Sequence, residues 1–150
     1  MNTLNDFTVL PLHEDYIPTA ASAEKICLGS EAWSEQSIRE TICLNGQYFA
    51  IFAGKNFAGH CGITTVLDEG YIINIVILPE FRRKGAATAL LSKICAHCRD
   101  IGLSFLSLEV RASNLAAIAL YEGLGFKVCG NRRAFYKDPT EDALIMTIKF

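Results

Sequence analysis

Three absences narrow the class of protein before any single residue is considered. No apolar run approaches membrane-spanning length, and residues 1–15 carry three acidic side chains without a basic start or a long apolar core. We therefore expect no membrane span and no secretory signal, and a cytoplasmic protein. With 14 basic and 16 acidic side chains the chain has no excess of positive charge, so no broad nucleic-acid-binding face is expected.

Common nucleotide and metal sites are missing as well. There is no G-x-x-x-x-G-K-S/T run and no G-x-G-x-x-G with an acidic residue about twenty positions later, which excludes a P-loop and a Rossmann fingerprint. Cys95, His97 and Cys98 are spaced like metal ligands, but no second C-x-x-C or H-x-x-x-H pair completes a tetrahedral set. We expect no metal, and we expect the six cysteines to be reduced thiols, most of them packed as small apolar side chains.

The order of the expected elements predicts an α/β fold. A length of 150 residues with 51% apolar composition fits a single domain over residues 1–150, and no repeat, low-complexity tract or linker interrupts it. Hydrophobic periodicity and turn residues predict helices over residues 15–29, 34–44, 83–101 and 113–125. The same signals predict strands over residues 7–12, 47–53, 58–67, 71–78, 104–110, 126–133 and 143–149.

These elements combine into a mixed sheet that is mainly antiparallel. Short Gly-Lys-Asn and Asp-Glu-Gly turns join the three strands between residues 47 and 78, which predicts an antiparallel meander. A helix then connects the strand at 71–78 to the strand at 104–110, and such a crossover makes two neighbouring strands parallel. We therefore expect about seven strands, with helices on both faces and one parallel pair.

A basic turn follows the strand over residues 71–78. Pro79 ends that strand, and apolar residues then recur at helical spacing, so a helix is expected from about Arg83. The first turn of a helix has unpaired N–H groups and the positive end of the helix dipole, so a phosphate-bearing ligand is expected there. A solvated basic helix start that binds nothing is the alternative. The turn comprises Arg82, Arg83, Lys84, Gly85, Ala86, Ala87 and Thr88.

A carboxylate lies at the end of the second parallel strand. Alternation along residues 105–110 places Glu109 on the face opposite most of the apolar side chains. Ligand sites in such sheets lie beyond the carboxyl ends of parallel strands, which makes Glu109 a candidate for chemistry. The alternative is a solvated or salt-bridged glutamate, with Arg111 as its partner.

The next helix adds two candidates. Asn114 is expected at its N-cap, and Tyr121 follows roughly 10 Å further along the helix axis. A tyrosine at this spacing is commonly a core residue with its hydroxyl at a wet edge, and that interpretation stays open.

Two groups of motifs resemble a known family. Arg82-x-x-Gly85-x-Ala87 after an apolar strand resembles the acyl-CoA-binding motif of the GNAT acetyltransferase superfamily, which has Gln or Arg, then Gly, then Gly or Ala. Within that superfamily, residues 33–146 are similar to the bacterial ribosomal-protein-alanine N-acetyltransferases, the RimI type. That similarity rests on Trp33-Ser34-Glu35, Leu108-Glu109-Val110-Arg111-Ala112-Ser113-Asn114, Ala117-Ile118-Ala119-Leu120-Tyr121, Gly125-Phe126, Arg132-Arg133, Tyr136, Pro139 and Glu141-Asp142-Ala143.

The resemblance implies a GNAT-like fold with the parallel pair at an acetyl-CoA site. It implies that residues 82–88 hold the pyrophosphate and that Asn114 contacts the pantetheine. Glu109 matches the general base of the family and Tyr121 its general acid. Backbone groups of three strand residues would contact the acetyl and pantetheine parts: Ile75, Val76 and Ile77. Ala87 stands where some members have glycine.

The resemblance also implies an acceptor. This is the α-amine of an N-terminal alanine, in a small-subunit ribosomal protein, acetylated by direct attack without a covalent enzyme intermediate. Trp33, Tyr136, Glu141 and Asp142 are candidate substrate-binding residues, and an acidic rim would suit a basic peptide. Two alternatives stay open: a GNAT enzyme for another peptide, a lysine or a small amine, and a non-catalytic acyl-CoA-binding module.

Overall fold

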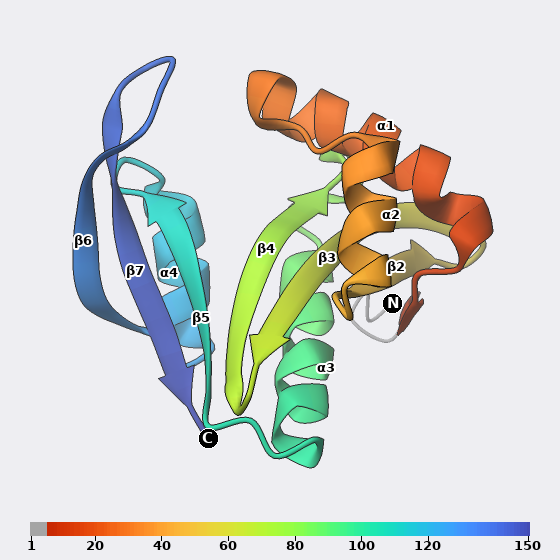
Figure 1. Ribbon diagram of the computed structural model, residues 1–150. Coiled ribbons are helices and arrows are strands. Elements are labelled where there is room, and N and C mark those ends of the chain that lie inside the picture. Colours follow the sequence, from red (N-terminus) through yellow and green to blue (C-terminus); the bar gives the residue numbers. More distant parts are fainter. Residues whose placement is uncertain (1–5) are drawn as a thin grey trace.

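The computed structural model describes residues 6–150. Within them, strands form a seven-stranded sheet in the order β1-β2-β3-β4-β5-β7-β6 (Figure 1). The strands are β1 (Phe7–Pro11), β2 (Gln47–Ala53), β3 (Asn56–Val66), β4 (Glu69–Ile77), β5 (Phe105–Arg111), β6 (Lys127–Tyr136) and β7 (Glu141–Lys149). The helices are α1 (Ile17–Leu28), α2 (Glu35–Cys43), α3 (Ala86–Asp100) and α4 (Leu115–Gly123), with short 3-10 turns η2 (Glu14–Tyr16), η3 (Gly29–Glu31) and η4 (Pro79–Phe81).

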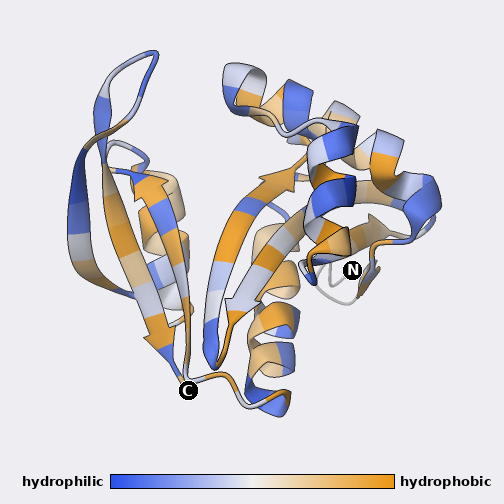
Figure 2. Cartoon of the chain, in the orientation of Figure 1, coloured by the Kyte–Doolittle hydropathy of each residue, from blue (hydrophilic) through white to orange (hydrophobic). Residues whose placement is uncertain are grey.

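The mixed, mainly antiparallel sheet is confirmed. β4 and β5 are parallel, and the other strand pairs of the sheet are antiparallel. Helices cover both faces, as expected: α1 and α2 pack over one apolar core, while α3 and α4 contribute to a second. Figure 2 shows hydrophobic residues along β5 and β7 and hydrophilic residues on much of α2, which lies at the surface. Each core buries one face of the sheet, which stabilises the fold.

The start of α3 differs from the expectation. The periodicity predicted a helix from about Arg83, but α3 begins at Ala86. The backbone explains the difference, because Arg83 has φ 61 and Gly85 has φ 85. Both values lie in the left-handed region, which a right-handed α-helix does not contain. Residues 82–85 therefore form a separate turn that leads into the helix.

The parallel pair is short, and this creates the main concavity of the molecule. β4 and β5 pair only at Glu69 with Phe105, Gly70 with Leu106, and Tyr71 with Ser107. Beyond this point the two strands diverge, so that the sheet opens like a V (Figure 1). On the other edge of β4, the register against β3 shifts between Gly62 and Ile63. A bulge of this kind bends the strand and increases its twist.

A buried polar cluster connects α1 to the centre of the sheet. The side chain of Glu24 on α1 is 0% exposed, and its Oε1 lies 3.2 Å from Nε2 of His60 on β3. The Asn74 amide on β4 donates to both Glu24 carboxylate oxygens, at 3.1 and 3.3 Å. Burying a carboxylate is costly unless hydrogen bonds replace those to water, so these contacts make α1 and β4 depend on one another.

All six cysteines are free thiols, as expected. Cys61, Cys95 and Cys98 are buried, and burial raises the pKa of the Cys98 thiol to about 11. Cys43 and Cys129 are exposed, and Cys27 is half-buried. No group of three or more metal-ligating side chains occurs in residues 6–150, and no helix there is both long and apolar enough to cross a bilayer.

Gly59 is predicted to be necessary for the contact between β3 and β4. A Cβ atom at Gly59 would collide with the backbone carbonyl oxygen of Val76, which cannot move without displacing β4. We expect Gly59→Ala to lower the free energy of unfolding by about 1–3 kcal/mol, measured by urea denaturation. Gly123→Ala is the control, because a Cβ there meets nothing within 4 Å. Equal loss of stability in both variants would contradict this account.

Candidate active site

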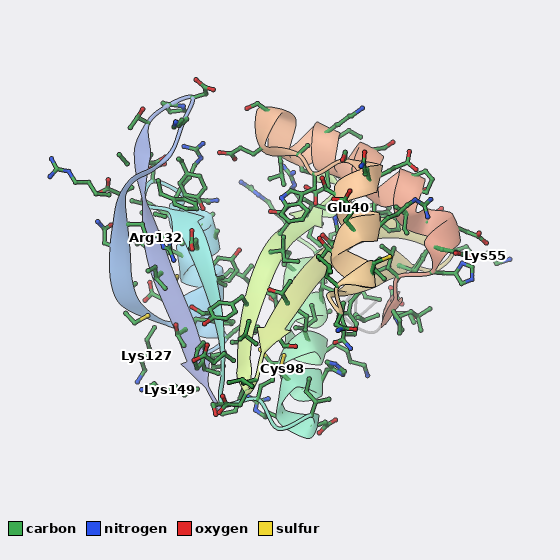
Figure 3. The ribbon with its side chains drawn as sticks, viewed as in Figure 1. Glu40, Lys55, Cys98, Lys127, Arg132 and Lys149 are labelled. Carbon is green, nitrogen blue, oxygen red and sulfur yellow. The ribbon has the colours of Figure 1, made fainter. Side chains whose placement is uncertain are left out.

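The diverging strands enclose a cleft of about 870 Å³. Its walls are formed by the α1–α2 connection, the middle of β4, residues 107–111 of β5, Asn114 and Tyr121 of the α4 segment, and the β6–β7 hairpin. Six of the candidate residues lie on these walls although they are far apart in the sequence: Trp33, Ile75, Glu109, Asn114, Tyr121 and Tyr136. A second groove of about 520 Å³ lies on α2 beside Glu40 (Figure 3), away from these side chains.

Glu109 lies on β5 with part of its side chain open to the cleft. Its Oε1 is 3.3 Å from Nε of Arg132, which extends from β6 (labelled in Figure 3). The alternative pairing of Glu109 with Arg111 is therefore wrong, because Arg111 forms ion pairs with Glu31 and Glu141. The sequence analysis missed this role of Arg132, since β6 and β5 are separated in the sheet by β7. The adjacent arginines Arg132 and Arg133 were the feature of the sequence that could have indicated a cationic partner for Glu109.

Tyr121 extends from the buried face of α4 to the cleft. It is 6% exposed, and its ring packs 5.9 Å from that of Phe126, centroid to centroid. Burial raises the pKa of the Tyr121 phenol well above its usual value. The group therefore stays protonated at neutral pH, which is the state that a proton donor requires. Tyr121 thus belongs to the core and also lines the cleft, and its role as an acid stays a prediction.

Asn114 and Tyr136 lie on the same cleft. Asn114 is the N-cap of α4, as expected, and its Oδ1 accepts a hydrogen bond from the Ala117 N–H at 3.2 Å. Tyr136 lies near the end of β6, where burial and the charges of Glu109 and Glu31 raise its pKa to about 12. Tyr136 is therefore a neutral, half-buried side chain close to the Glu109 carboxylate.

The basic turn leads into α3 at one end of β4. Gly85 is the N-cap residue of α3 and supplies no side-chain cap, so the first-turn N–H groups are not satisfied by a capping side chain. Arg82 does not point freely into solvent: its Nε donates to the Ile77 carbonyl at 2.9 Å and its Nη2 contacts Cys27 Sγ at 3.4 Å. Arg83 and Lys84 are exposed beside it. This arrangement fits a diphosphate, because N–H donors, a helix dipole and cations converge.

Glu141 and Asp142, the two acidic candidates, form hydrogen bonds with other parts of the protein. Glu141 accepts hydrogen bonds from the Ser113 N–H at 2.6 Å and from Arg111 at 3.3 Å, and these contacts lower its pKa. Asp142 accepts from the Ala134 N–H at 2.8 Å, which lowers its pKa too. Neither residue lies on the cleft wall. Trp33 and Tyr136 line the cleft and these two carboxylates do not, although Glu141 is the direct β7 partner of Tyr136 in the hairpin.

Comparison with known proteins identifies the family. Residues 12–126 match the acetyltransferase (GNAT) family. The chain belongs to the GNAT family. This GNAT chain is 38% identical over 118 residues to the ribosomal protein bS18-alanine N-acetyltransferase of Escherichia coli K12, covering 77% of this chain and 80% of that one. With the Salmonella typhimurium protein of the same name the identity is 47% over 120 residues, with the same coverage of both chains.

Solved structures agree with this assignment. The crystal structure of the ribosomal-protein-S18-alanine N-acetyltransferase from Escherichia coli matches with a TM-score of 0.88 and 34% identity, over 95% of this chain and 93% of that one. A GNAT acetyltransferase from Elizabethkingia anophelis with acetyl-CoA bound matches with a TM-score of 0.83 at 16% identity, over 97% and 99% of the two chains. The second likeness shows the shared fold alone.

The raised pKa of Tyr121 predicts how stability depends on alkaline pH. A phenol whose pKa is higher in the folded than in the unfolded state stabilises the fold fully below pH 10, and this contribution falls as pH rises above 10. Tyr121→Phe removes the effect, so its free energy of unfolding should fall less steeply between pH 9 and 11, by up to about 1.4 kcal/mol per pH unit. Urea denaturation across this range measures both slopes. Identical slopes would show that Tyr121 ionises without a penalty.

Proposed function

We propose that this chain is an N-terminal protein acetyltransferase that transfers an acetyl group from acetyl-CoA to the α-amine of an N-terminal alanine, on ribosomal protein bS18. The observation that carries the proposal is the identity of 36–47% with proteins named for this activity, across 77% of the chain. The fold alone does not select this acceptor, because a spermidine/spermine N-acetyltransferase from Vibrio cholerae has the same fold at 20% identity.

The residues around β4 are proposed to bind acetyl-CoA, which supplies an acetyl group activated as a thioester. In the described part of the chain, residues 72–77 of β4 have no strand partner on the side of β5. Part of this backbone is open to a ligand, although the Ile77 carbonyl already accepts from Arg82, and the backbone groups of Ile75, Val76 and Ile77 are proposed to hold the acetyl and pantetheine parts. Residues 82–88 are proposed to hold the diphosphate, and Asn114 to contact the pantetheine.

Glu109 is the proposed general base. An α-amine has a pKa of about 7.7–8.0, so it is largely protonated at neutral pH and must lose a proton before it attacks. Glu109 lies on the cleft wall and can accept this proton directly or through a water. The incoming ammonium would also compete with Arg132 for the carboxylate. Tyr121 is the proposed acid, because its protonated phenol can donate to the departing thiolate.

Direct transfer fits the cysteines better than a covalent enzyme intermediate. Of the six cysteines, Cys27 lines the cleft. Burial raises the pKa of its thiol, in spite of the nearby Arg82. The thiol donates weakly to the Ile77 carbonyl at 3.5 Å, and a thiol is a far weaker nucleophile than a thiolate. We therefore assign no catalytic role to Cys27.

Glu109→Gln is expected to lower kcat/KM by about 10²- to 10⁴-fold at pH 7. The loss should shrink as pH rises above about 8, because the free amine then forms without a base. Initial rates with an acceptor peptide from pH 6.5 to 9.5 measure this profile. Glu122→Gln, an exposed glutamate on α4, serves as the matched control. A loss that stays constant over the whole range would assign Glu109 a binding role in place of proton transfer.

An acceptor panel tests the proposed function itself. A peptide with the N-terminal sequence of bS18 should gain one acetyl group from acetyl-CoA, detected by mass spectrometry. The same peptide with a blocked α-amine, a lysine-containing peptide with a blocked N-terminus, and spermidine should remain unmodified. Turnover of spermidine or the lysine peptide alone would indicate a different GNAT acceptor. Binding of acetyl-CoA without turnover on any amine would indicate a non-catalytic module.

A further inference from the structure

Arg111 makes a dense set of contacts at the mouth of the cleft. It lies two residues after Glu109 on β5, and so on the same face of the strand. Its side chain is 22% exposed. Its guanidinium donates to Glu31 Oε1 (2.6 Å), to the carbonyls of Lys137 (3.1 Å) and Pro139 (3.1 Å) and to Glu141 Oε1 (3.3 Å), and lies 4.4 Å from the centre of the Tyr136 ring.

These partners belong to two opposite walls of the cleft. Tyr136, Lys137, Pro139 and Glu141 form part of the β6–β7 hairpin, whereas Glu31 ends η3, between α1 and α2. In Figure 1 the end of α1 and the tip of the hairpin lie at the same open end of the V, on its two sides. The contact between Glu31 and Arg111 therefore crosses the mouth of the cleft.

The two ends of this contact are held unequally. Arg111 has two carbonyls, a second carboxylate and an aromatic ring on the hairpin, so it stays in place without Glu31. The Glu31 side chain is 39% exposed, and its ion pair is with Arg111. The connection that carries Glu31 is a single short 3-10 turn. Separation of the pair thus moves the α1–α2 connection and leaves the hairpin intact.

We infer that the Glu31–Arg111 ion pair is a latch that closes the acceptor side of the cleft and opens when a peptide enters. The inference rests on the proposed function, because a peptide acceptor must bring its N-terminus between the two walls to reach Glu109. Neighbouring peptide backbones lie about 4.7–4.9 Å apart. Arg111 Nη2 and Glu31 Oε1 are only 2.6 Å apart, so no peptide backbone fits between these two atoms. No peptide passes this point while the latch is closed.

The sequence provides a reporter and a matched control for this latch. Trp33 is the single tryptophan of the chain, lies two residues after Glu31 and lines the cleft. Glu31→Gln removes the charge of the latch while it keeps the shape of the side chain. Glu35→Gln makes the same change two residues on the other side of Trp33, where Glu35 pairs only loosely with Arg39 on α2, at 3.8 Å.

Two measurements test the latch, one with an acceptor and one without. Relative to Glu35→Gln, Glu31→Gln should lower the KM for the bS18 peptide roughly two- to fivefold, the worth of a partly exposed ion pair, with kcat changed less than twofold. In the free protein, Glu31→Gln should raise the acrylamide quenching of Trp33 fluorescence.

Each outcome decides the question. A KM that is unchanged or higher in Glu31→Gln would overturn the latch, because Glu31 would then be neutral or a ligand of the peptide. If the wild-type protein acetylates no peptide, the proposed function fails and quenching alone decides. Raised quenching would then still support a closed mouth in the free protein, and unchanged quenching would refute it.

Discussion

The three-residue parallel ladder between β4 and β5 is the constraint on which the rest of the site depends. Gly70 lets the side chains of Leu103 and Leu106 pack closely against this ladder, because a Cβ there would crowd the ends of both leucines. The strands are held together at the base and diverge above it, while an apolar core on each face keeps the V rigid. A longer ladder would hydrogen-bond the β4 edge and fill the cleft. The divergence leaves that edge without a strand partner, and Glu109 lines the same cleft.

Several carboxylates of this protein are satisfied by hydrogen bonds within the fold. Glu24 is fully buried and is compensated by Asn74 and His60, so it couples α1 to the strand that lines the cleft. Glu141 connects the start of β7 to the turn before α4 through the Ser113 N–H, and Asp142 stabilises the β6–β7 hairpin through the Ala134 N–H. Carboxylates that are satisfied inside the protein have little left to offer a ligand. Of the acidic side chains in this loop, Glu141 and Asp142 thus serve the internal structure, whereas Asp138 lines the cleft.

Local signals in the sequence were sufficient to predict most of the helices and strands. Ser34 and Asn114 are N-caps in the structure, because their side chains accept hydrogen bonds from nearby N–H groups whatever the rest of the fold does. The parallel pair followed from the helical crossover. The start of α3 was misplaced, since a positive φ at Arg83 is not encoded by its side chain. The Arg132–Glu109 pair was missed, because its partners come from strands that do not adjoin.

The sequence by itself determined the family, the order of helices and strands and the chemical groups that the site can contain. Periodicity, caps and short motifs act over a few residues, so they can be identified without a structure. Only the tertiary structure decided which of these groups meet. Where β4 and β5 part, which arginine pairs with Glu109, and the contact of Arg111 with Glu31 across the cleft depend on packing between distant segments. The basic turn indicates a class of ligand from a few neighbouring residues, whereas the cleft exists because two strands diverge in the folded protein.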